Sequence, residues 1–191
     1  MSESKLKTTP GKKRVASFLK KTIIILPIAV VLLILGYQFI ARPFQVSTGM
    51  EPTIKKDSYI LQLLLPLRFI SPGRQDVVVF RIPKDPEKDY VSRIIGVPGD
   101  KIALKDGYVF LNGKLLDEPY TLKPRSTWAY NNAPFGKNCE EITVPNDSYF
   151  VLGDNRGTSD FSIYLGFISR DKIFGYMPHG LVRFLTYYPI D

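Results

Sequence analysis

The chain has 191 residues, of which 45% are hydrophobic and 23% charged, and its formal charge is +8. This length fits one ordinary domain, or one domain with an anchor. The single cysteine, Cys139, excludes an intramolecular disulfide framework and a multi-cysteine zinc site, and the single histidine, His179, excludes a histidine-rich metal centre.

The positive charge lies mainly at the N-terminus. Residues 1–21 carry a net charge of +6, whereas residues 42–191 carry +2. A nucleic-acid-binding domain would carry its positive charge on the folded part, so this distribution argues against a nucleic-acid partner. We expect residues 1–21 to form a flexible basic tail.

The uncharged stretch at residues 22–41 predicts a transmembrane anchor. Its sequence is TIIILPIAVVLLILGYQFIA, and about 20 helical residues span a hydrocarbon core of ~30 Å. A cleaved secretory signal is the alternative, but bulky Phe39 stands at the minus-three position, where a small residue is needed. The positive-inside rule then places the basic tail in the cytoplasm and residues 42–191 on the outer side of the membrane.

Short apolar segments separated by turn signals follow the anchor and predict a mainly β domain over residues 42–191. Strands are expected at residues 58–63, 76–82, 90–96, 101–104, 107–111, 114–116 and 148–153, and apolar segments at 173–177 and 181–185 close the domain. Asn112-Gly113 fits a tight hairpin turn. Residues 117–142 are polar and rich in turn residues, which indicates an insertion. The close spacing of the strands favours a curled sheet or a barrel.

Four sequence stretches follow the anchor in a defined order. They are PFQVSTGMEPTI at residues 43–54, DVVVFR at 76–81, DYVSRIIGVPGD at 89–100, and YFVLGDNR at 149–156 followed by Ser159 and Gly166. Together with the anchor they resemble the type I signal peptidase family, whose members remove signal peptides at the outer face of the cytoplasmic membrane. The resemblance covers the anchor and nearly all of residues 43–176, and four ordered matches are a specific signal.

The resemblance implies a Ser/Lys catalytic dyad. A serine hydroxyl attacks the scissile carbonyl, and a lysine amine, desolvated until its pKa approaches neutrality, takes the proton. A backbone N–H and a hydroxyl stabilise the oxyanion. The substrate would lie extended along a strand edge, with small side chains entering two shallow apolar pockets. The residues of this chain at the positions where the resemblance implies contact with the substrate are Thr48, Gly49, Met50, Pro52, Asp154 and Asn155.

The nucleophile motif departs from the family pattern, Ser-Gly-Ser-Met-x-Pro-Thr-Leu, in which the second serine attacks. Without a gap, Gly49 stands at the nucleophile position; with one residue deleted before Met50, the preceding residues match better. Neither alignment places a hydroxyl there. Ser47 and Thr48 are the neighbouring hydroxyls that a shifted loop would have to present.

The base and the supporting motif depart as well. Ser92 stands where the family has its lysine, and a hydroxyl is no base near pH 7, while Arg93 stays protonated. Ser159 matches the hydroxyl that orients the lysine amine. Phe161-Ser162-Ile163 stands in place of Asp-Ser-Arg, which removes an expected ion pair. Because nucleophile and base act as one unit, we expect most of the chemistry to be lost.

The leading expectation is a mainly β, signal-peptidase-like domain on one N-terminal transmembrane helix, catalytically impaired but still binding extended signal-peptide-like segments. The first alternative is an active signal peptidase that cleaves exported preproteins with a displaced nucleophile, Ser47 or Thr48. The second is a membrane-tethered structural module. We expect the lipid bilayer, signal peptides or preproteins, and an active signal peptidase as partners, and neither a metal nor a cofactor.

Overall fold

The computed structural model describes residues 10–39, 41–46, 50–64, 70–105, 107–121, 141–156 and 161–185. The chain divides into two compact units, residues 1–40 and residues 41–191.

The first unit contains the long helix α1 (Pro10–Phe39). Proline suits the first helical position, because its missing N–H is not needed there. The helix begins well before the apolar stretch, so residues 10–21 are helical rather than flexible; lysine and alanine in this segment are good helix formers. Its window Lys20–Tyr37 has a mean hydropathy of 2.0, none of it is buried, and it is long and apolar enough to cross a membrane.

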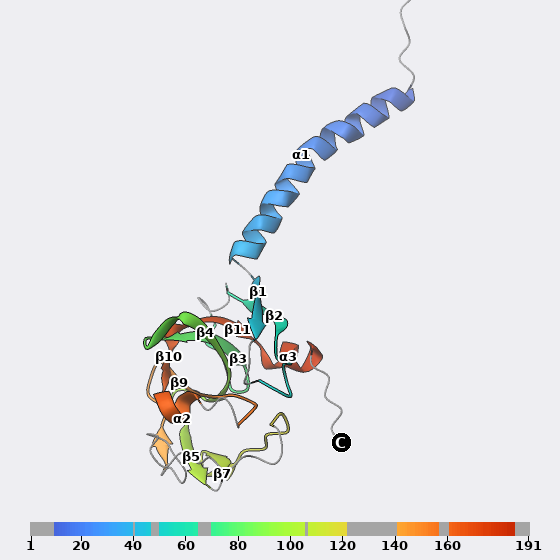
Figure 1. The fold of residues 1–191 in the computed structure, drawn as a ribbon. Helices are drawn as coiled ribbons and strands as arrows, with labels where there is room; N and C mark the ends of the chain where they lie inside the picture. Colours follow the sequence, from blue (N-terminus) through green and yellow to red (C-terminus); the bar gives the residue numbers. More distant parts are fainter. Residues whose placement is uncertain are drawn as a thin grey trace, which may run out of the picture. The chain divides into compact units, whose positions relative to one another are not determined.

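The second unit is mainly antiparallel β structure. Its larger sheet has seven strands in the order β1-β2-β11-β3-β4-β9-β10, and Figure 1 shows it curving strongly along β4. The bounds are β1 (Ala41–Val46), β2 (Ser58–Leu63), β3 (Val77–Ile82), β4 (Asp85–Gly96), β9 (Ser148–Leu152), β10 (Ile168–Ser169) and β11 (Ile173–Met177). Within the described residues β1 and β10 remain as edges, so the sheet is curled but does not close into a barrel.

The smaller sheet has the order β7-β6-β5-β8. Its strands are β5 (Lys101–Lys105), β6 (Tyr108–Leu111), β7 (Lys114–Leu115) and β8 (Ile142–Thr143). Asn112 and Gly113 join β6 to β7 with φ angles of 51° and 76°, the two positive values that a type I′ hairpin requires. The predicted hairpin is therefore confirmed.

The two faces of the larger sheet carry different apolar clusters, because successive strand residues point to opposite faces. The motif-side cluster contains Val46, Met50, Ile54, Ile60, Val77, Val79, Val91, Met177 and Val182. The reverse-side cluster contains Val78, Phe80, Ile82, Ile94, Tyr149, Val151, Ile168, Ile173 and Tyr176. A third cluster, around Ile102, Leu104, Val109 and Phe150, joins the smaller sheet to β9.

Gly175 is required by a close approach between two strands. A Cβ at this position would lie 2.0 Å from Oε1 of Gln62, whose side chain occupies the space above the glycine. Gln62 is 5% exposed, and its Oε1 is buried with no hydrogen-bond partner. The amide oxygen of Gln62 is therefore buried in the sheet without a hydrogen bond to replace the one it would make with water.

Three short helices complete the described unit: α2 (Phe161–Leu165), the 3₁₀ turn η2 (Arg170–Lys172) and α3 (His179–Leu185). Residues 181–185, an apolar segment that was expected to close the domain, lie in helix α3. The N–H groups of Leu181 and Val182 both donate to the carbonyl oxygen of Pro178, which starts the helix.

Candidate functional site

Three residues from separate motifs meet in the folded unit: Thr53, Arg93 and Asp154. The Arg93 guanidinium donates two hydrogen bonds to Asp154, from Nε to Oδ1 at 2.8 Å and from Nη2 to Oδ2 at 2.6 Å. Thr53 Oγ1 donates to Asp154 Oδ2 and accepts from Arg93 Nη2 at 3.2 Å. The side chains of the ion pair are 2% and 0% exposed. This fork-like pairing fixes the loop after β9 against strand β4, and the hydrogen bonds of Thr53 attach the segment that follows Met50 to both.

The Nη1 group and the flat face of the Arg93 guanidinium also have partners. Its Nη1 donates to the carbonyl oxygen of Gln75 at 2.9 Å, and the guanidinium lies 4.2 Å from the centre of the Tyr120 ring. A buried cation is tolerated only when its charge and its donors are matched in this way. Arg93 is therefore structural and is unavailable as a base.

A second buried ion pair lies beside the first. Arg156 binds Glu118, and the two side chains are 1% and 0% exposed. Tyr120 connects the pairs, because its hydroxyl donates to Glu118 Oε1 at 3.1 Å while its ring contacts Arg93. Burial, followed by the charge of Glu118, raises the pKa of Tyr120. The beginning of the polar segment after β7 is thus attached to the motif residues.

Ser92, the residue predicted to stand at the position of a catalytic base, is fully buried. Its Oγ donates to the carbonyl oxygen of Val91 at 2.8 Å. Ser92 pairs with Val78 across β3 and β4, and directly paired residues project to the same face, so its side chain faces the reverse-side cluster. The hydroxyl is held by its own strand in an apolar environment.

The segment after the nucleophile position packs inward. Met50 is fully buried in the motif-side cluster, and its carbonyl oxygen accepts the N–H of Ile54 at 2.8 Å. Pro52, which follows a cis peptide bond, is half-buried. Asn155 Nδ2 donates to Glu51 Oε2 at 3.5 Å, so the loop after β9 contacts this segment as well.

The structure brings together the segments of Met50, Pro52, Asp154 and Asn155. The other predicted site residues, Ser47, Thr48, Gly49 and Ser159, lie outside the described residues, as does Cys139. His179 begins α3, and its backbone N–H donates to Asp76 Oδ1 at 2.8 Å. Lys55, Lys56 and Lys101 are exposed, as expected for surface charges.

Two of the open strand edges of the larger sheet, judged among the described residues, lie beside the predicted site. β1 pairs only with β2, and residues 85–92 of β4 pair only with β3. Val46 ends β1 immediately before residues 47–49, and Val91 immediately precedes Ser92. Both valines belong to the motif-side cluster. Each of these edges therefore ends beside one of the positions that the sequence predicted for the nucleophile and the base.

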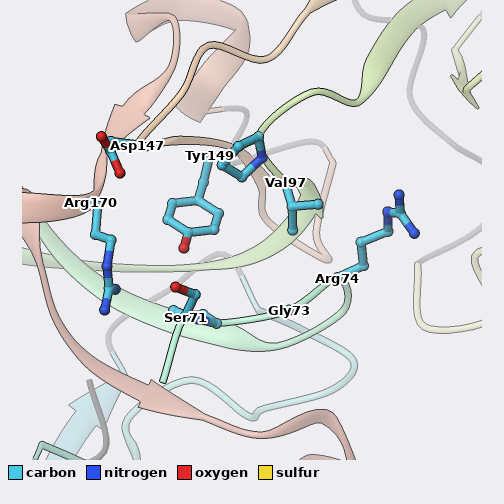
Figure 2. Close-up of a pocket in the computed structure, with 9 residues that line it drawn as sticks. Ser71, Gly73, Arg74, Val97, Asp147, Tyr149 and Arg170 are labelled. Atoms are coloured by element: carbon cyan, nitrogen blue, oxygen red, sulfur yellow. The ribbon is translucent and has the colours of Figure 1, made fainter. Parts of the chain in front are cut away.

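A cavity of about 480 Å³ lies elsewhere in the unit, lined by Ser71, Pro72, Gly73, Arg74, Val97, Pro98, Asp147, Tyr149 and Arg170. Figure 2 shows the Tyr149 ring in its middle, with Asp147 and Arg170 on one side and Arg74 on the other. Arg74 is bound to Asp100 through two hydrogen bonds of 2.7 and 2.5 Å. The cavity shares no lining residue with the Thr53–Arg93–Asp154 contacts.

Sequence reasoning missed the structural roles of Thr53, Arg93, Glu118 and Tyr120. Their partners are distant along the chain: Arg93 and Asp154 are 61 residues apart, and Glu118 and Arg156 are 38 apart. The signal for Arg93 was a permanently charged residue inside an apolar strand, since such a residue needs a buried counter-charge.

Comparison with known proteins gives a consistent result. Residues 19–180 match the family described as signal peptidase, peptidase S26. A "Probable signal peptidase I-2" of Synechocystis is 38% identical over 144 residues, which cover 72% of this chain and 60% of that protein. A "Signal peptidase IB" of Staphylococcus aureus is 34% identical over 163 residues, which cover 80% of this chain and 84% of that protein.

Among solved structures, a signal peptidase I from Enterococcus faecalis is similar to this chain. It is 26% identical, with a TM-score of 0.43, and the match covers 56% of this chain and 97% of that one.

Proposed function

The chain belongs to the S26 signal peptidase family, and we propose that it is a membrane-anchored member that binds signal-peptide segments of preproteins without cleaving them. The two open strand edges carry this proposal. An extended peptide can add to such an edge through its backbone and present every second side chain to the face below. Here the strand residues on that face, Val46 of β1 and Val91 of β4, belong to the apolar motif-side cluster.

The loss of cleavage is supported by what stands at the base position. Ser92 supplies a hydroxyl that already donates to Val91, and it has no basicity to offer. A lysine acts as a base only when burial lowers its pKa. Every lysine from Lys20 onward whose side chain is described is exposed. No described lysine can therefore replace the missing one.

Retention of the peptide-binding frame is supported by the buried contacts of Thr53, Arg93 and Asp154. These residues join the segment after Met50, strand β4 and the loop after β9, which are the parts that border the substituted positions. None of them depends on a nucleophile or on a base. These contacts would therefore keep the peptide-binding frame folded in a chain that has lost its catalytic groups.

The proposal includes the site residues and the membrane arrangement. Thr48, Gly49, Met50, Pro52, Asp154 and Asn155 would border the bound peptide. α1 would anchor the chain, with the basic N-terminus in the cytoplasm and the β unit outside. An active signal peptidase of the same membrane would be a partner, because both proteins would meet the same preproteins.

The test is cleavage of a preprotein by the detergent-solubilised full chain beside two repaired variants. One combines Gly49→Ser with Ser92→Lys, and the other combines a serine inserted after Gly49 with Ser92→Lys. We expect the native chain to be silent and at least one repaired variant to cut. The matched control is Gly49→Ser with Ser92→Met, which fills the same space as the repaired chain without a base and should stay silent.

Cleavage by the native chain would overturn the proposed impairment, and Ser47→Ala and Thr48→Ala would then identify the displaced nucleophile. Binding is measured separately, as fluorescence anisotropy of a labelled synthetic signal peptide with the native chain. Failure of the native chain to bind any such peptide would refute the binding function and favour the tethered structural module.

A further inference from the structure

The cavity around Tyr149 is separate from the proposed peptide site. Tyr149 belongs to the reverse-side cluster and Val97 packs against that cluster, whereas the open edges border the motif-side cluster. The cavity volume of about 480 Å³ falls in the range of small-molecule sites. No residue that lines it is among those proposed to border the bound peptide. Any ligand of this cavity would therefore be a second ligand of the chain.

Hydrogen bonds fix the walls of the cavity. In the connection before β3, the Gly73 N–H donates to Asp76 Oδ2 at 2.8 Å. At the start of η2, the Arg170 N–H donates to the carbonyl oxygen of Asp147 at 2.8 Å, which ties η2 to the turn before β9. A ligand would therefore enter a preformed site and would not have to order a loop.

Two hydroxyl groups meet in the cavity. Figure 2 shows the hydroxyls of Tyr149 and Ser71 pointing toward one another. No hydrogen bond joins them, and neither has a hydrogen-bond partner among the described residues. Tyr149 is 2% exposed, so its hydroxyl has little access to water except from the cavity. An unpartnered hydroxyl in such a place costs free energy, and one acceptor oxygen between the two groups would receive both donors.

A positive charge lies beside the two hydroxyls. Arg170 Nη2 donates at 3.2 Å to the carbonyl oxygen of Ile70, the residue that precedes Ser71. This guanidinium favours an acceptor that is negatively charged. Asp147 lies on the same side of the Tyr149 ring as Arg170, and it would repel a dianion such as phosphate more strongly than a monoanion. The charges therefore select a carboxylate.

The rest of the lining accepts an apolar group. Val97 is half-buried and Pro98 is exposed, so both present apolar surface to a ligand in the cavity. We propose that the cavity binds a monocarboxylate with an apolar body, whose carboxylate lies between the hydroxyls of Tyr149 and Ser71. A few polar groups that orient a ligand within an apolar lining are typical of small-molecule sites.

The test is binding of para-fluorophenylpropionate to the full chain in lipid nanodiscs, followed by fluorine NMR, with empty nanodiscs to measure membrane partition. The acid should bind at least ~10-fold more tightly than its amide, which carries no charge. Tyr149→Phe keeps the ring and removes the donor, so it should weaken binding about tenfold, and Arg170→Gln should weaken it by about as much.

Two matched controls test whether these losses belong to the cavity. Tyr176→Phe removes a hydroxyl from the same reverse-side cluster, and Lys172→Gln removes a positive charge from η2. Neither residue lines the cavity, so both variants should bind the acid as the native chain does. Thermal unfolding checks that each variant is folded.

A second probe, acetyl-alanyl-phenylalanine with a free carboxylate, separates the two sources of this chemistry. Tighter binding of the dipeptide identifies the end of a peptide chain as the ligand, and tighter binding of the small acid identifies a free acid; either supports the site. Equal affinities for acid and amide, or unaltered binding in Tyr149→Phe, overturn the proposal. Binding of neither probe also overturns it and leaves the hydroxyls as a site for water only. None of these outcomes depends on peptide binding at the open edges.

Discussion

Removing the negative charge of the buried pair Arg93–Asp154 should strongly destabilise the β unit. Asp154→Asn keeps the shape of the side chain but leaves the Arg93 cation buried, with both hydrogen bonds of 2.8 and 2.6 Å losing their charged acceptor. Breaking one partner of such a pair costs about 3–5 kcal/mol. Total stabilities are about 5–15 kcal/mol, so this single change should remove a large share.

The assay is denaturant unfolding of the full chain in detergent, followed by near-ultraviolet circular dichroism. Arg93→Met and the double variant Arg93→Met/Asp154→Asn complete a cycle that isolates the interaction. The two single losses of unfolding free energy, added together, should exceed the loss of the double variant by at least ~2 kcal/mol. The reason is that the double variant leaves no unpaired charge in the interior. Additive losses, or a loss below about 1 kcal/mol for Asp154→Asn, would refute the reasoning.

Three further predictions concern stability. Gly96→Ala should destabilise the unit by about 1–3 kcal/mol in denaturant unfolding, because the new Cβ would lie 2.8 Å from Ile102 Cδ1, whereas Gly73→Ala, whose nearest contact is 3.7 Å, should be nearly neutral. Gln62→Met should raise the melting temperature, since it removes the unpartnered oxygen while keeping the shape; a lower value would show that the amide contributes a contact. Burial alone would raise the pKa of Asp100, but hydrogen bonds from Arg74, Asn112 and the Val97 N–H lower it below 3.8. The Asp100 carboxylate therefore stabilises the folded chain above pH 3.8, and this stability is lost as the pH falls through the folded pKa. Asp100→Asn should have a lower unfolding free energy than the native chain at pH 7, and the difference should vanish in acid. A difference that stays constant with pH would contradict this.

The sequence predicted local elements well where strand and turn signals agreed. Strands at 58–63 and 173–177 have the predicted bounds, and Asn112-Gly113 forms the predicted turn. The sequence left the secondary structure of 181–185 open, because a five-residue apolar run fits a strand and a buried helix equally well, and the structure forms a helix there. β4 begins at Asp85 rather than Tyr90, because pairing with β3 extends a polar segment that propensity alone disfavours.

The site was less predictable than the fold. Each motif was visible by itself, and the substituted position Ser92 could be identified from its neighbours. The contact of Arg93 with Asp154 and the packing of Val182 into the motif-side cluster arise from the folded arrangement of distant segments. Local patterns carry no information about which buried cation meets which buried anion, because that is fixed by strand order.

The separation of the buried ion pairs from position 92, the predicted base position, has an evolutionary consequence. Thr53, Arg93 and Asp154 hold the frame together, while position 92 contributes one hydroxyl bonded to its own strand. If the proposed loss of cleavage holds, substitutions at position 92 should barely affect folding, because its hydroxyl is bonded only to its own strand among the contacts described. Deep mutational scanning for folded protein would show this as tolerance of small residues at position 92 beside near-invariance at positions 53, 93 and 154.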